Sequence, residues 1–115
     1  MAQEIKFGTD GWRGIIADDF TFDNVRRVAG AIASYVVKYE YAQRGVFVGY
    51  DTRFSSQRAA EVVAEVVAAA GVPVKLSNDY TPTPAVSYAV KANGAAGGVM
   101  VTSSHNPWNW NGVKF

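Results

Sequence analysis

The sequence contains no cysteine among its 115 residues, which excludes disulfide bonds and thiolate metal sites. It has a single histidine, and its formal net charge of +1 gives no overall field to attract nucleic acid or an anionic membrane. No apolar stretch approaches membrane-spanning length, and the opening residues MAQEIKFGTDGW lack the apolar run of a signal peptide. We therefore expect a soluble, cytoplasmic protein that binds neither nucleic acid nor a membrane.

The chain does have enough apolar material for a core. Hydrophobic residues make up 49% of it and charged residues 18%, which is ordinary for a globular protein. Its length suits one domain that folds without disulfides or metal. No repeat, low-complexity tract or linker interrupts it, so we expect one domain over residues 1–115.

Short apolar runs alternate with amphipathic segments along the chain. Strands are expected at residues 5–7, 14–17, 46–50, 72–76 and 97–101. Helices are expected from the N-cap Thr21 to about residue 41, from Ser55 or Ser56 to Gly71, and from Thr83–Pro84 to Gly94. Whether the first two apolar runs pair as a hairpin or flank a wide loop is left open.

This alternation predicts the fold class. Strands that alternate with helices are joined by right-handed crossovers and form a largely parallel sheet. The runs V-F-V-G-Y and G-G-V-M-V are nearly continuous in apolar residues, as expected when helices cover both faces of a sheet. We predict an α/β protein: a three-layer α/β/α sandwich with a mixed, largely parallel sheet of about four strands.

Polar clusters follow the expected strands, where open α/β sheets bind their ligands. They are D-T-R at residues 51–53, N-D-Y at 78–80 and T-S-S-H-N at 102–106. Asp10 and Arg13 can join them if the N-terminal loop folds over the same edge. For the first two clusters alone, ordinary turn and helix-capping chemistry is the favoured interpretation.

The segment V-T-S-S-H-N-P-W-N-W-N-G-V-K-F, residues 101–115, is the most unusual part of the sequence. Its Ser-His pair suggests a serine hydrolase, but neighbours on an extended strand point to opposite faces, so His105 is poorly placed to deprotonate Ser104. The G-x-S-x-G elbow of hydrolases and the Walker phosphate loop are both missing. One histidine among asparagines would bind zinc weakly, and a lone histidine is more often structural than catalytic.

Phosphoryl transfer fits these residues better. The reaction needs a hydroxyl to hold the group, cations to neutralise its charge and a shuttle for the proton of the attacking hydroxyl. Ser104 can hold the group, Arg13 and a divalent ion can neutralise it, and Lys114 can move the proton. On composition alone this is one hypothesis among several.

Four segments resemble motifs of the α-D-phosphohexomutase superfamily, which includes phosphoglucomutases, phosphomannomutases and phosphoglucosamine mutases. They are F-G-T-D-G-W-R-G (7–14), V-G-Y-D-T-R-F-S-S (48–56), T-P-T-P (81–84) and T-S-S-H-N-P (102–107). Their shared order makes the signal specific, and the resemblance covers the whole chain as the first domain of that family.

The resemblance implies roles for individual residues. Ser104 is expected to be the phosphoserine and one ligand of a Mg²⁺ ion, and Lys114 the general acid and base. Arg13 is expected near the phosphoserine, and His105 in the active-site loop in a supporting role near the substrate. Ser103 is expected to make loop hydrogen bonds rather than carry the phosphate.

The family reaction moves phosphate between the 1- and 6-positions of a hexose phosphate through a hexose 1,6-bisphosphate. The resemblance therefore implies these two sugars as partners in the full enzyme. The sequence stops at Phe115, whereas family members continue through further domains that carry the metal-binding, sugar-binding and phosphate-binding loops. We expect an excised first domain that is inactive unaided, packs against the missing domains and can self-associate through exposed apolar surface.

Two alternatives stay open at this point. A non-catalytic phosphosugar-binding module would keep the fold without turnover, although it would have little need for Lys114 as a proton shuttle. The W-N-W segment, residues 108–110, can stack on a sugar or on a neighbouring domain, and packing is the favoured interpretation. The choice among glucose, mannose and glucosamine phosphates is not readable from these residues.

Overall fold

The structure is a computed structural model that describes residue 5 and residues 11–39, 42–104 and 106–115. The elements follow in the order β1 (Trp12–Ile15), α1 (Phe22–Lys38), a 3₁₀ turn (Ala42–Arg44), β2 (Val46–Tyr50), α2 (Ser56–Ala69), β3 (Val74–Leu76), α3 (Thr83–Asn93), β4 (Gly97–Val101) and β5 (Trp110–Lys114). The predicted alternation of strands and helices is confirmed up to β4. The last strand, β5, was not expected.

The strands form one mixed sheet in the order β1-β5-β4-β2-β3. β2 pairs in parallel with both β3 and β4, whereas β5 is antiparallel to β4 and to β1. The sheet therefore has a parallel half, β4-β2-β3, and an antiparallel half, β1-β5. The prediction of a mixed sheet of about four strands is confirmed, with five strands found in the described part of the chain.

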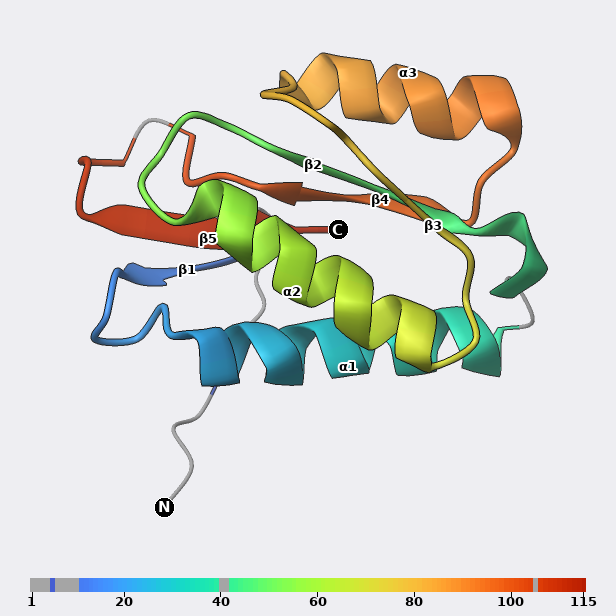
Figure 1. Cartoon of the computed structure of the whole chain (residues 1–115), viewed down its shortest axis with the longest axis horizontal. Helices are drawn as coiled ribbons and strands as arrows, with labels where there is room; N and C mark the ends of the chain where they lie inside the picture. The colour runs from blue at the N-terminus through green and yellow to red at the C-terminus, as the bar shows by residue number, and fades with distance from the viewer. Residues whose placement is uncertain (1–4, 6–10, 40–41, 105) are drawn as a thin grey trace.

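Helices cover both faces of the sheet, so the predicted three-layer sandwich is confirmed. In Figure 1, α1 and α2 lie side by side below the sheet and α3 lies above it. α3 packs chiefly on β2 and β4. The core between the sheet and the α1–α2 pair is rich in fully buried valines, among them Val25, Val36, Val63 and Val99.

The helix ends follow local sequence signals. Thr21 caps α1, and its hydroxyl accepts a hydrogen bond from the Asn24 amide at 3.2 Å. Gly94 ends α3 in the left-handed conformation, with φ of 62°, as predicted. The cap of α3 is Pro82, one residue before the predicted Thr83, and Ser55 caps α2 without a side-chain hydrogen bond.

The antiparallel half differs most from expectation. β1 begins at Trp12, in a segment predicted to be a polar turn, and its Trp12 side chain is buried. Ile5 lies outside any strand, and the rest of the expected strand 5–7 falls outside the described residues. β1 extends because β5 is there to pair with it, from Trp12 opposite Val113 to Ile15 opposite Trp110.

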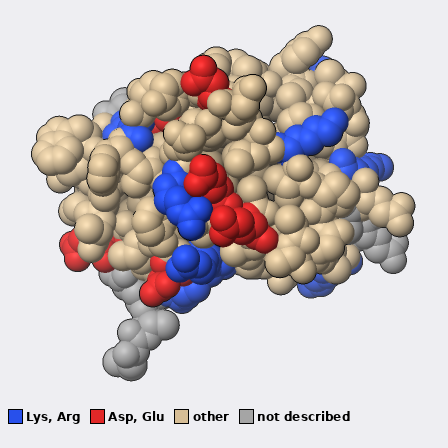
Figure 2. All heavy atoms as spheres, viewed as in Figure 1, with Lys and Arg blue, Asp and Glu red and all other residues tan. Residues whose placement is uncertain are grey.

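The described helices are all too short or too polar to cross a membrane. Figure 2 shows basic and acidic side chains interspersed on one face, with most of that face formed by uncharged residues. That distribution agrees with the small net charge of +1.

Candidate active site

The candidate site lies where β2 and β4 end. These strands are parallel neighbours, so the turn after Tyr50 and the loop after Val101 leave the sheet at the same edge. Figure 1 shows the two segments side by side at the left of the molecule. We call residues 102–109, between β4 and β5, the serine loop. The predicted convergence of polar clusters is found here for residues 51–53 and the serine loop.

The two adjacent serines of this loop have opposite environments. Ser103 is fully buried, and its hydroxyl donates a hydrogen bond to Asn106 Oδ1 at 3.0 Å. Ser104 is exposed and adopts a left-handed backbone with φ of 51°, which is uncommon for a residue other than glycine. The hydroxyl of Ser104 is thus the one of the pair that a ligand can reach.

Arg53 ties the serine loop to the end of β2. Its Nη2 donates to the carbonyls of Ser104 and Asn106, both at 2.7 Å. Its Nη1 donates to the carbonyls of Pro107 and Trp110, at 2.7 and 3.0 Å. The Arg53 side chain is only 13% exposed. Its four carbonyl partners lie between 51 and 57 positions further along the chain, so Arg53 joins two segments that are far apart in the sequence.

Asp51 anchors the same loop from its other side. Its Oδ2 accepts a 2.6 Å hydrogen bond from the Thr102 hydroxyl and faces Arg53 Nε at 3.4 Å. Its Oδ1 accepts hydrogen bonds from the Ser56 hydroxyl at 2.7 Å and from the Arg53 amide at 3.0 Å. This carboxylate is therefore occupied by the protein itself.

Arg13 reaches the site from β1. Its Nη1 donates to Asn106 Oδ1 at 2.7 Å, so the same oxygen accepts from Arg13 and from Ser103. Its Nε is buried and has no hydrogen-bond partner among the residues that the structure describes. Arg13 thus lies beside the serine loop, and within the described part of the chain one of its donors is not engaged.

Lys114 lies on the same face of the sheet as Arg13. Arg13 is opposite Gly112 in the β1–β5 register, and Lys114 is two residues further along β5, where side chains return to the same face. A Cβ at Gly112 would lie 3.0 Å from Arg13 Cγ and 2.4 Å from the Trp12 carbonyl, so only glycine leaves room there. Lys114 is half-buried, and its side chain forms no hydrogen bond or ion pair with any residue that the structure describes.

Two predicted site residues lie outside the described residues: Asp10 and His105. Among the residues that are described, no group of three or more His, Cys, Asp or Glu side chains could hold a metal ion. Magnesium prefers about six oxygen ligands. Ser104 can supply one such oxygen, whereas Asp51 is already engaged by Arg53, Thr102 and Ser56.

Tyr50 is the last residue of β2 and is buried. Burial raises the pKa of its phenol above the ordinary 10.0, and the charge of Asp79 adds to that effect. Its ring meets Tyr80 edge-on with centroids 5.9 Å apart. This phenol is a neutral packing group at physiological pH.

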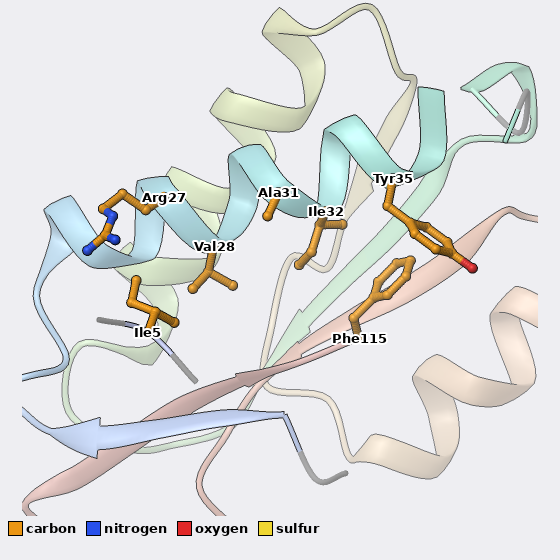
Figure 3. Close-up of a pocket in the computed structure, with 7 residues that line it drawn as sticks. All are labelled: Ile5, Arg27, Val28, Ala31, Ile32, Tyr35 and Phe115. Carbon is orange, nitrogen blue, oxygen red and sulfur yellow. The ribbon is translucent and has the colours of Figure 1, made fainter. Parts of the chain in front are cut away.

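A second hollow in the molecule is chemically different. A cavity of about 480 Å³ lies between α1 and the end of β5 and is lined by Ile5, Arg27, Val28, Ala31, Ile32, Tyr35 and Phe115. Figure 3 shows the rings of Tyr35 and Phe115 turned toward each other, and their centroids are 5.9 Å apart. Apolar side chains dominate its lining, and no serine-loop residue is among them.

The sequence interpretation missed two important residues. Asp51 and Arg53 were assigned to turn chemistry, yet they hold the serine loop together. The available signal was their position after a buried strand, at the edge where the serine loop also emerges. Nothing in the local sequence revealed that Arg53 would span to four backbone carbonyls of another segment.

Comparison with known proteins gives consistent results. Residues 4–115 match the family model described as phosphoglucomutase/phosphomannomutase, alpha/beta/alpha domain I. The chain is 38% identical over 109 residues to a phosphoglucosamine mutase of Carboxydothermus hydrogenoformans, covering 95% of this chain and 24% of that protein. It is 42% identical over 120 residues to the glucose 1,6-bisphosphate synthase of Homo sapiens, covering 94% of this chain and 19% of that protein.

Solved structures show the same fold. A crystal structure of a protein assigned as a phosphomannomutase, from Thermus thermophilus, superposes with a TM-score of 0.95 at 42% identity, covering 100% of this chain and 26% of that one. The chain thus spans about a quarter or less of the length of these relatives. The chain belongs to the phosphoglucomutase/phosphomannomutase family and corresponds to its α/β/α domain I.

Proposed function

We propose that this chain is the phosphoserine-bearing domain of a phosphohexomutase that interconverts hexose 1-phosphate and hexose 6-phosphate. The observation that carries the proposal is the contrast between two neighbouring serines. Ser103 is fully buried and engaged with Asn106, whereas Ser104 is exposed on a loop held by Arg53. A nucleophile that exchanges a phosphoryl group with a sugar needs that combination of access and fixed position.

The chemistry assigned to the residues is as follows. The bond between phosphorus and Ser104 Oγ breaks as a bond to a hexose hydroxyl oxygen forms, and the proton of that hydroxyl passes to the amine of Lys114. This yields a hexose 1,6-bisphosphate. The bisphosphate reorients, its other phosphoryl group returns to Ser104, and Lys114 returns the proton to the oxygen that is released.

Arg13 helps to neutralise the charge of the phosphoserine, and Arg53 holds the loop that carries it. A phosphoserine carries close to two negative charges at neutral pH and would otherwise repel an anionic sugar phosphate. Arg13 bonds to Asn106 in the serine loop, and Arg53 bonds to the carbonyl of Ser104 itself. Nearby cations favour the charged form of a phosphate group. In this proposal His105 supports the loop near the substrate.

Magnesium is proposed as the cofactor, with a phosphoserine oxygen of Ser104 as its ligand from this domain. The ion would supply charge neutralisation at the transferring phosphoryl group. The described residues hold no group of three or more acidic, His or Cys side chains, so its other ligands are proposed to be water molecules and groups outside these residues. We propose that further domains of the full enzyme supply those ligands and contact the exposed aromatic side chains of this domain, which include Phe54, Tyr88 and Trp108.

The test compares the two serines in the full-length enzyme that contains this chain. Ser104→Ala is expected to abolish mutase turnover measured with Mg²⁺, a hexose 1-phosphate and a hexose 1,6-bisphosphate activator. Ser103→Ala removes one hydrogen bond but leaves Asn106 Oδ1 bonded to Arg13, so most of the turnover should persist. Equal losses in both variants would refute Ser104 as the phosphate carrier. A wild-type enzyme that binds sugar phosphate without turnover would favour a non-catalytic binding module.

A further inference from the structure

The guanidinium of Arg53 is fully used by the protein. Its two terminal nitrogens donate to four backbone carbonyls, and Nε faces the carboxylate of Asp51. A guanidinium has no donors beyond those on these three nitrogens. Arg53 is therefore unavailable to bind a substrate phosphate, although it lies next to Ser104.

The contacts of Arg53 and Asp51 close a ring around the backbone of Ser104. The Ser104 amide donates to the Thr102 hydroxyl at 3.1 Å, and that hydroxyl donates to Asp51 Oδ2 at 2.6 Å. The Ser104 carbonyl accepts from Arg53 Nη2, and Arg53 Nε faces the same Asp51 oxygen. Both polar groups of the Ser104 backbone thus lead to one ion pair.

This ring explains how Ser104 holds an unfavourable conformation. A left-handed backbone is unfavourable in a residue with a Cβ, and it persists only where the surroundings impose it. Hydrogen bonds with a charged partner are stronger than those between neutral groups, so the bond from Arg53 to the Ser104 carbonyl can offset that cost. The two serines that meet at this left-handed residue differ in exposure: Ser103 is buried and Ser104 is exposed.

We propose that Arg53 is the positioning residue for phosphoryl transfer, with Asp51 as its counter-ion: it fixes the Ser104 hydroxyl in place without touching the substrate. The inference rests on the proposed function of Ser104. Beyond that function, Arg53 is expected to affect the rate of phosphoryl transfer and not the binding of substrate, because all of its donors face the protein. Lysine cannot replace it, because a single ammonium group cannot reach carbonyls on both sides of the loop.

The test uses the full-length enzyme with Arg53→Lys and Arg53→Ala, below the melting temperature of each variant. We expect kcat to fall on the order of 10²-fold, as for a small misplacement of a reacting group, while KM for the hexose phosphate stays near the wild-type value. Ethylguanidinium should restore part of the kcat of Arg53→Ala, and ethylammonium should not. Arg58→Ala is the matched control, because Arg58 is exposed on α2 and, within the described part of the chain, its side chain bonds only to Glu61 and Glu65.

Hydrogen exchange in the serine loop distinguishes a failure of this inference from a failure of the proposed function. Hydrogen exchange at the amides of Ser104, Asn106 and Trp110 should quicken in Arg53→Lys and stay unchanged in Arg58→Ala. Unchanged exchange, a rise in KM at constant kcat, or full activity in Arg53→Lys would each overturn the positioning role. A wild-type enzyme that never phosphorylates Ser104 would instead overturn the proposed function, whatever the exchange data show.

Discussion

The two halves of the sheet do different work. The parallel half, β4-β2-β3, packs against α2 on one face and, through β2 and β4, against α3 on the other, and its strands carry fully buried valines such as Val48 and Val99. The antiparallel half, β1-β5, lies beside the strands on which α3 chiefly packs. Arg13 and Lys114 lie on the same face of this antiparallel half. Both halves contribute to the core, since Val113 of β5 is also fully buried, but the residues of the proposed chemistry lie on the antiparallel half.

The serine loop joins the two halves. It leaves the parallel strand β4 and returns as the antiparallel strand β5, and Arg53 holds it from the end of β2. Ser104 therefore lies between the end of the parallel half and the antiparallel half, which carries Arg13 and Lys114. We expect substitution of Lys114 to lower turnover with little effect on stability, and substitution of a buried residue in the parallel half to lower stability with little effect on turnover.

The largest expected effect is on Lys114, in the antiparallel half. In the full-length enzyme, Lys114→Ala should lower kcat by about 10²–10⁴-fold, the usual contribution of a general acid or base. Because the Lys114 side chain is half-buried and makes no hydrogen bond or ion pair with the described residues, the melting temperature should change little. Lys91→Ala, at an exposed position of α3, is the control and should keep wild-type turnover. A Lys114→Ala enzyme with normal kcat would remove the proposed proton shuttle.

A smaller effect, with the opposite signature, is expected for Val99 in β4. Val99→Ala deletes methyl groups from a position that is 0% exposed, so the free energy of unfolding should fall by about 2 kcal/mol. The measurement is urea unfolding of the chain followed by circular dichroism, with turnover of the folded full-length enzyme measured in parallel and expected to be normal. Val37→Ala is the control, because Val37 is 47% exposed and should change stability by less than about 0.5 kcal/mol. Equal losses from the two variants would show that the burial of Val99 in the sheet does not determine its contribution to stability.

The same two halves differ in how far the sequence predicted them. The strands at residues 46–50 and 97–101 were predicted with the bounds that the structure shows, because buried parallel strands read as continuous apolar runs. β5 has no such run, and its sequence W-N-G-V-K places Asn111 at a fully buried position. That asparagine is accommodated by hydrogen bonds from its side-chain amide to the Phe54 carbonyl and the Ser56 hydroxyl. A buried polar residue interrupts the apolar pattern by which a strand is predicted, and its hydrogen-bond partners cannot be identified from the neighbouring sequence.

The site shows the same limit. Ser104, Lys114 and Arg13 were predicted from motifs, and the structure places Arg13 beside the serine loop and Lys114 on the same face as Arg13. Arg53 and Asp51 were read as turn residues, since their partners lie about fifty positions away along the chain. The two tryptophans of the W-N-W segment differ in burial: Trp108 is 84% exposed and does not pack on this domain, whereas Trp110 is half-buried in β5. Local sequence indicates which residues carry chemistry, but not which ones hold them in position.

The most direct test of the account locates the phosphoryl group. The full-length enzyme is incubated with a hexose 1,6-bisphosphate and Mg²⁺, quenched, digested and sequenced by tandem mass spectrometry. We predict a single phosphoserine in the serine loop, at Ser104, that disappears when the enzyme is chased with excess hexose phosphate. A phosphoryl group on the buried Ser103, or a serine loop that stays unmodified, would contradict it.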